Sequence, residues 1–309
     1  MMLSRTRKLW AKWTARLVNA GSFLMLTGCS VSRLGMLNPQ GIVTYEERRL
    51  FFDTLALMLI VVLPVIVMSF TFLYHYRASH RLRDYKPNWS HNHFLEMLWW
   101  GIPCIIILVL AVLTWKKTYQ LDPYRKITAS TQSILLIQAI ALPWKWLFIY
   151  PQQHLATVNY LMLPVGQEVE FWITADNVPM SAFFIPQLSS QIYAMTGMRT
   201  QLHLVANRTG EYEGLNALYN GAGFSDMHFT VRVVEAEEIH SWFATTQKMA
   251  THLTELAYRQ LLNPSMNNVP QAYSDVKSGL FEEVVELYMY SLGPAHPREA
   301  LIHLNSHHQ

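Results

Sequence analysis

A single carboxylate stands at the edge of an apolar run, where few charged groups are tolerated. Glu96 directly precedes Met97–Trp115, a segment without any charged side chain. An ionisable group at the end of a membrane span is a functional candidate, because placing a charge there is costly. The alternative is a first-turn carboxylate that the helix dipole favours, with Ser90 or Asn92 near the cap.

The two cysteines restrict the chemistry further. Cys104 lies inside the same apolar run, and Cys29 closes the sequence Leu26-Thr27-Gly28-Cys29 after a basic leader. This layout resembles a bacterial lipoprotein signal, which predicts removal of residues 1–28 and acylation of Cys29. The alternative is a plain secretory signal. No cysteine follows residue 104, so the rest of the chain has no disulfide and no thiolate metal ligand.

Histidine and methionine could also bind metals, but their spacing does not favour a site. Neither His91 with His93 nor His307 with His308 has the i, i+4 spacing of a helical site. We therefore interpret the histidines as interfacial or tail residues and the methionines as core residues. The pairs and clusters in question are His91 and His93, His307 and His308, and Met195, Met198 and Met227.

Two apolar spans must position Glu96. Leu55–Leu73 and Met97–Trp115 each approach the ~20 residues that a helix needs to cross a bilayer. They predict a transmembrane hairpin over residues 54–118, preceded by a periplasmic segment, 29–53. With Cys29 outside, the connector faces the cytoplasm, as the positive-inside rule prefers. Its basic residues are Arg77, Arg81, Arg83 and Lys86.

The hydrophobic pattern changes after the second apolar span. Short runs bounded by proline and glycine predict an extracytoplasmic all-β sandwich or barrel over residues 125–235. Alternation is clearest in Glu168–Thr174 and Met227–Val234. The other expected strands are Ile134–Ile140, Trp146–Tyr150, Gln201–Ala206 and Gly214–Tyr219.

A helical extension over residues 236–290 is expected to follow the β domain. Apolar periodicity predicts helices over Ala236–Leu262 and Leu280–Tyr290. A polar tail, 291–309, ends the chain. The net charge of +3 is too small for a nucleic-acid binder.

These parts together resemble subunit II of the haem–copper respiratory oxidases. Glu96, Trp99 and Pro103 match that family's Glu, Trp and Pro pattern at the start of the second span. Trp144-Lys145-Trp146 matches its aromatic strand, and Phe183–Pro186 matches the Phe-x-x-Pro run after the first copper ligand. The resemblance covers most of residues 24–290 and implies a cupredoxin-like sandwich.

The copper ligands of that family are not found in this sequence. The resemblance aligns its six ligand positions with residues that include no cysteine, no histidine and no carboxylate, so we expect no metal in this chain. These positions are Ser181, Tyr219, Gly221, Gly223, Met227 and Thr230. A cupredoxin domain without copper resembles subunit II of the cytochrome bo-type ubiquinol oxidases. The aromatic residues at Trp242, Phe243, Tyr258, Tyr273, Phe281, Tyr288 and Tyr290 resemble that group's C-terminal extension.

The resemblance implies a function for the assembly. It implies a proton-pumping ubiquinol oxidase of the bacterial inner membrane that reduces oxygen to water, with haems and copper in subunit I. This chain would carry no cofactor, contact subunit I, small membrane subunits and lipid, and provide Glu96 where protons enter. We interpret Trp144 and Trp146 as packing aromatics near the membrane face.

Two other functions remain open at this stage. One is a cytochrome c oxidase subunit with its own copper, which the missing cysteine pair argues against. The other is a degenerate cupredoxin lipoprotein that acts as a membrane-anchored binding or assembly module. The Glu96, Trp99 and Pro103 pattern argues against that module, because an anchor needs no carboxylate at the start of a span.

Overall fold

A computed structural model describes residues 35–77, 92–127, 134–178 and 180–289. The predicted signal with Cys29, the basic residues after Arg77, His91, Tyr290 and the polar tail with His307 and His308 lie outside these ranges.

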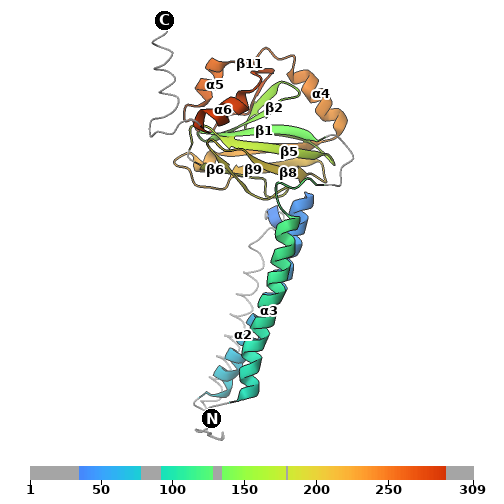
Figure 1. Ribbon diagram of the computed structural model, residues 1–309, viewed down its shortest axis with the longest axis vertical. Helices are drawn as coiled ribbons and strands as arrows, with labels where there is room; N and C mark the ends of the chain where they lie inside the picture. The colour runs from blue at the N-terminus through green and yellow to red at the C-terminus, as the bar shows by residue number, and fades with distance from the viewer. Residues whose placement is uncertain (1–34, 78–91, 128–133, 179, 290–309) are drawn as a thin grey trace, which may run out of the picture.

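Two long helices lie side by side and extend away from a β domain (Figure 1). Helix α2 spans Ile42–His75 and α3 spans His93–Gln120, and each contains one of the expected apolar spans. Both are long and apolar enough to cross a membrane, and their apolar windows are unburied within the chain. Their exposed apolar surface therefore needs lipid or another protein as its surroundings.

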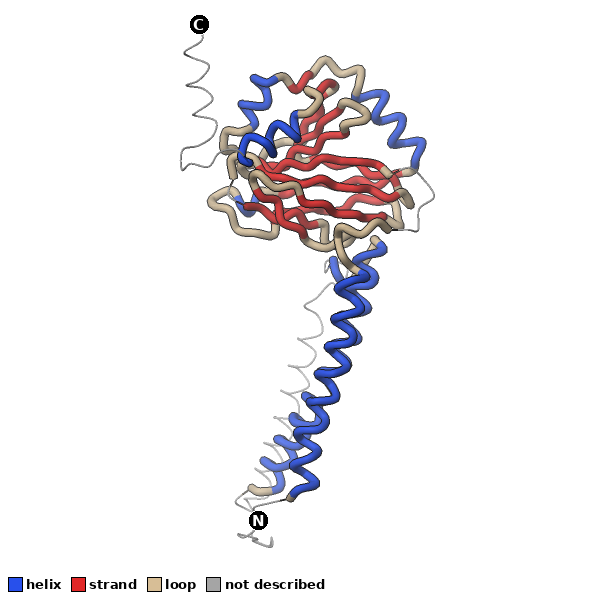
Figure 2. The backbone as a smooth tube through the Cα atoms, viewed as in Figure 1, coloured by secondary structure: helices blue, strands red, loops and turns tan. Residues whose placement is uncertain are grey.

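Two β-sheets form the domain (Figure 2). Among the described residues, the larger sheet has the order β12-β3-β2-β1-β5-β8, and the other has the order β4-β10-β9-β6-β7. The strands of the first are Gln271–Tyr273, Leu155–Val158, Lys145–Tyr150, Leu135–Leu142, Glu168–Ala175 and Thr200–Val205. Those of the second are Tyr160–Pro164, His228–Val234, Gly210–Asn216, Met180–Phe184 and Ile192–Met195.

The sandwich interior is aromatic. Phe148 on β2, Phe183 on β6 and Phe229 on β10 surround the buried ring of Trp146, with ring centroids 5.0–6.5 Å apart. Trp146 is completely buried, as a packing aromatic would be. Alternation along β2 directs it into the sandwich.

The chain changes sheets at a single residue. β3 and β4 are separated by Asn159, which adopts a positive φ of 54° and accepts a hydrogen bond from the Trp146 amide at 2.8 Å. Asparagine tolerates this left-handed conformation better than most residues. The sequence analysis did not anticipate β3, β4, β6 or β7, whereas the six expected strands correspond to β1, β2, β5, β8, β9 and β10.

The first helix of the C-terminal extension packs against the sandwich interior, and the later part covers the outer face of the larger sheet. The elements of the extension are α4 (Ala236–Thr246), β11 (His252–Leu253), α5 (Glu255–Leu261), β12, β13 (Asp275–Val276) and α6 (Leu280–Met289). The single helix predicted over Ala236–Leu262 is therefore wrong. Residues 247–254 leave the helix because Leu253 turns inward and β11 pairs in parallel with β13.

The helices join the domain directly at two points. Before α2, the 3-10 turn η2 (Gly35–Leu37) leads to Gly41, whose amide donates to Gln187 O and which bridges to Ala206. After α3, Pro123 O accepts from the His203 amide of β8 at 3.1 Å. A hydrogen bond from Ser190 Oγ to Glu47 and an ion pair between Lys117 and Glu46 (2.7 Å) reinforce this junction.

Candidate functional site

Ser181 and Met227, two of the six positions aligned with copper ligands, lie close together in the fold. Both are fully buried. Asn220, from the β9–β10 loop, places its Nδ2 3.4 Å from Ser181 Oγ and 3.2 Å from Met227 Sδ. Its buried Oδ1 has no hydrogen-bond partner in the described part of the chain. A polar amide therefore fills the space between these two positions.

Trp144 covers the same loop. It sits at the β1–β2 turn with a positive φ of 60°, and its Nε1 donates to Asn220 O at 3.3 Å. Gly223 lies against the indole so closely that a Cβ would come within 2.4 Å of the ring. Gly221 adopts a φ of 112°, which L side chains rarely adopt. Both glycines are thus required by the indole and by the path of the loop.

The remaining two positions point elsewhere. Tyr219 is 75% exposed, and its ring packs against Phe224 in the 3-10 turn η3 (Phe224–Asp226), with centroids 5.6 Å apart. Thr230 lies on β10 on the face opposite to buried Phe229 and Val231. The gathered donors are therefore a hydroxyl, an amide and a thioether. This set does not fit a dinuclear copper–thiolate centre, which needs thiolate sulfur.

Glu96 lies in the first turn of α3, at the end of the hairpin far from the domain. Its side chain is 52% exposed, and Oε2 is 3.6 Å from His93 Nδ1. The helix cap is made by Asn92, whose Oδ1 accepts from the amides of Phe94 and Leu95 at 3.0 and 3.2 Å. Glu96 is therefore not needed to cap the helix.

Trp99 and Pro103 follow Glu96 at i+3 and i+7, so all three share one face of α3. Trp99 is 62% exposed and Pro103 is half-buried. Pro103 has no N–H, so the carbonyl four residues earlier, that of Trp99, loses its usual helical donor. The face thus presents a carboxylate and an accepting carbonyl one turn apart.

The C-terminal extension is fastened by polar contacts that the sequence analysis missed. The buried carboxylate of Asp176, which follows β5, accepts hydrogen bonds from the hydroxyls of Tyr258 on α5 and Tyr288 on α6. Asn177, the next residue, also bonds to the extension and leads toward β6 and Ser181. The extension therefore contacts the segment that precedes Ser181, the first of the positions aligned with copper ligands.

Lys145 provides a second fastening. Its buried Nζ donates to Leu261 O at 3.0 Å, to Asn263 O at 2.9 Å and to Ser265 Oγ. Burial lowers the pKa of the Lys145 amine. The sequence does not predict these contacts. Lys145 belongs to the Trp144-Lys145-Trp146 motif, and Tyr258 and Tyr288 belong to the aromatic set of the extension, but residue type alone does not reveal their hydrogen-bond partners.

Comparisons with known proteins agree with this geometry. Residues 109–234 match the family described as "Cytochrome C oxidase subunit II, periplasmic domain", and residues 247–291 match the "COX Aromatic Rich Motif". The chain is 42% identical over 280 residues to the "Cytochrome bo(3) ubiquinol oxidase subunit 2" of Pseudomonas aeruginosa, covering 90% of this chain and 83% of that relative.

Two further relatives come from other genera. The "Ubiquinol oxidase subunit 2" of Acetobacter aceti is 42% identical, with 91% of this chain and 90% of the relative covered. The "Quinol oxidase subunit 2" of Bacillus cereus is 34% identical, with 82% and 86% covered. The identity therefore extends through the hairpin, the sandwich and the extension.

Proposed function

Because this chain belongs to the family of subunit II of ubiquinol oxidases, we propose that it serves as the non-haem subunit of a proton-pumping enzyme that oxidises ubiquinol and reduces oxygen to water. The hairpin would cross the inner membrane and pack on subunit I, which would hold the haems and copper. The β domain would stand on the periplasmic side.

We propose that no electron passes through this chain. The observation that supports this is the donor set of the former ligand region, where Asn220 joins Ser181 to Met227 and Trp144 closes the loop. Ubiquinol would then deliver electrons directly to subunit I, without a copper relay.

The test is purification of the oxidase through a tag on this chain. We expect haem-bearing subunits to co-purify, quinol to drive oxygen uptake, and reduced cytochrome c to drive none. Added copper should produce no purple thiolate absorbance. Purification without haem would instead favour a membrane-anchored binding module. Oxidation of cytochrome c would favour a cytochrome c oxidase subunit with its own copper centre.

We also propose that Glu96 takes up protons on the cytoplasmic side. Three features support this role: the separate cap at Asn92, the exposed Trp99 on the same face as Glu96, and the freed Trp99 carbonyl. A partner helix against this face would enclose a carboxylate and an acceptor at the end of the span, as a proton path requires.

The lipid anchor at Cys29 is a further part of the proposal. We expect Cys29→Ala to alter processing but to leave the protein in the membrane, because two spanning helices hold it more firmly than acyl chains. Mass spectrometry of the mature N-terminus checks this. An unmodified N-terminus at another residue would remove the anchor from the proposal.

A further inference from the structure

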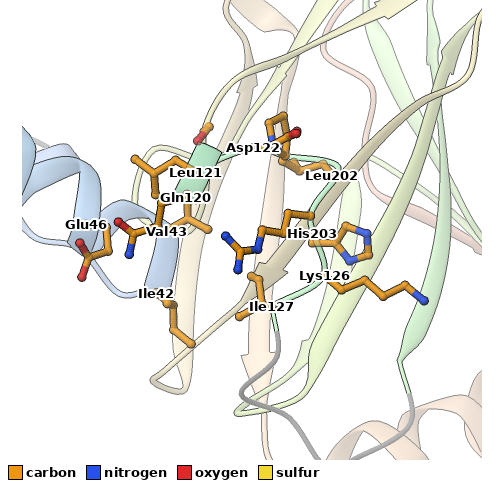
Figure 3. A pocket seen from close by; sticks show the side chains of 13 residues that line it. Ile42, Val43, Glu46, Gln120, Leu121, Asp122, Lys126, Ile127, Leu202 and His203 are labelled. Carbon is orange, nitrogen blue, oxygen red and sulfur yellow. The ribbon is translucent and has the colours of Figure 1, made fainter. Parts of the chain in front are cut away.

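A cavity of about 230 Å³ lies where the two long helices meet the base of the sandwich (Figure 3). The ends of the helices, with Val43 and Leu121, line one side, and Leu202 and His203 of β8 line the other. Ile42 and Ile127 contribute further apolar surface. The cavity therefore lies beside the ends of the two helices that join the domain.

The cationic residues at this cavity differ in how they are neutralised. Lys117, on α3 nearby, is paired with Glu46, which lines the cavity. Arg125 and Lys126 also line it, are exposed, and form no ion pair with any residue in the described ranges. The Arg125 guanidinium makes one long hydrogen bond, 3.4 Å, to Tyr119 O. The exposed carboxylate of Asp122 also lines the cavity, so one net positive charge is left for a ligand.

A buried histidine adds a polar group to the wall. His203 is 3% exposed, and its Nδ1 lies 3.0 Å from Glu168 Oε1, which also accepts from the Ile127 amide at 2.8 Å. Nε2 has no hydrogen-bond partner among the described residues. Because Nδ1 faces Glu168, Nε2 is the ring nitrogen left for a ligand in the cavity.

We propose that this cavity binds the headgroup of an anionic phospholipid from the outer leaflet of the membrane. The phosphodiester would contact Arg125 and Lys126, with His203 Nε2 at its inner side. The acyl chains would extend past the polar ends of α2 and α3 toward the apolar spans of these helices. Arginine and lysine both bind phosphate, arginine with a planar pair of donors. The inference rests on the membrane placement proposed above and adds a ligand that the catalytic role does not require.

The test is native mass spectrometry of the detergent-purified oxidase complex titrated with phosphatidylglycerol. The double variant Arg125→Gln/Lys126→Gln should weaken binding of one lipid about tenfold or more, the effect of losing a charge-assisted hydrogen bond. The matched control, Arg49→Gln/Lys116→Gln, removes the same charge from exposed residues near the same ends of the helices that do not line the cavity. It should change binding less than about twofold.

Quinol-driven oxygen uptake is measured first in each preparation, so loss of the proposed function is seen separately from loss of lipid. Equal weakening in both double variants would overturn the site in favour of general surface charge, and no weakening in either would also overturn it. Phosphatidylcholine binding as tightly as phosphatidylglycerol would refute the choice of an anionic lipid. Displacement of the lipid by equimolar inorganic phosphate would identify a free-anion site instead.

Discussion

Asn220 and Trp144 together close the β9–β10 loop, which the sequence resemblance aligns with copper-ligand positions. The side-chain amide of Asn220 lies between a hydroxyl and a thioether, and the indole lies over two glycines. A loop held by side-chain packing can keep its shape without a metal. The shape then depends on the absence of a Cβ at Gly223.

We expect Gly223→Ala to disturb this region. The added methyl group would come within 2.4 Å of the Trp144 ring, so the indole or the loop must move. Such overpacking costs about 1–3 kcal/mol of the free energy of unfolding. Chemical denaturation of the purified complex, followed by Trp fluorescence, measures it. Ala222→Ser, at the exposed neighbouring position, should be neutral, and equal stability of the two variants would disprove the packing argument.

Glu96 tests the proton-uptake proposal at the scale of one side chain. Glu96→Gln keeps the shape but cannot bind and release a proton, so oxygen uptake per haem should fall by about tenfold or more. Glu96→Asp keeps a titratable group and should retain more activity. Assembly and haem content should be unchanged in both variants.

Asp53→Asn is the control, because it removes an exposed carboxylate from the other helix. It should leave turnover unchanged. If Glu96 acts only through the helix dipole, its replacement by glutamine would cost at most ~1 kcal/mol of stability. Turnover would then be normal, and Glu96 would have no part in proton uptake.

At the scale of elements, the larger sheet is buried on both faces. The inner face packs in the sandwich, and the outer face packs under α5, α6 and the strands β11 and β13, so every residue of β2 is buried. A strand covered on both sides carries a continuous apolar run rather than alternation. The extension is therefore part of the fold of the domain and not an appendage.

Tyr258→Phe should loosen that attachment. It removes one of the two hydroxyls that bond to the Asp176 carboxylate, and a hydrogen bond to a charged group contributes about 1.5–3 kcal/mol. We expect faster proteolysis within residues 247–289, measured on the whole complex. Tyr193→Phe, on a half-exposed tyrosine of β7, should change nothing. Equal protection of the two variants would show that the Tyr258 hydroxyl does not hold the extension.

The strands that could be predicted from sequence are those in which apolar residues alternate along the chain. Alternation in Glu168–Thr174 and in Met227–Val234 reflects one buried face, and both strands are present. β3 and β4 were missed because their apolar run continues through Asn159, where only the positive φ marks the change of sheet. The predicted helix over Ala236–Leu262 failed because periodicity does not report the pairing of β11 with β13.

The candidate site was predicted as a set of positions but not as a geometry. Sequence alignment placed Ser181 and Met227 in the former ligand region, and the structure brings them together through Asn220. Nothing in the sequence distinguishes Asn220 from other loop asparagines, because its role depends on contacts between β6 and the β9–β10 loop. The positive φ of Trp144 is likewise a property of the folded turn.

At the scale of the whole molecule, tyrosines with buried side chains should make the protein less stable at alkaline pH. Burial raises the pKa of Tyr150, Tyr160, Tyr212 and Tyr273 above the ordinary value of 10.0. A raised pKa in the folded state stabilises the fold below pH 10, and that stabilisation is lost as the pH rises through the folded-state pKa. We therefore expect the free energy of unfolding to fall above pH 10 as unfolding releases these phenol protons.

Tyr150 is the most deeply buried of the four, with its hydroxyl bonded to both Met162 O and Met162 N. Denaturation of Tyr150→Phe across this pH range should show a shallower decline than the wild type, although the variant starts less stable. Parallel declines would assign the alkaline sensitivity to other groups.

No flexible linker separates the hairpin from the domain at Gly41, because α2 begins at the next residue. Gly41 bridges to Ala206 and α2 begins at the next residue, so the rotation of the helix about its axis is set by the sandwich. One residue inserted here would turn the helix by about 100°. It would turn a different face of α2 toward α3. The joint therefore sets the direction in which each face of α2 points relative to the sandwich.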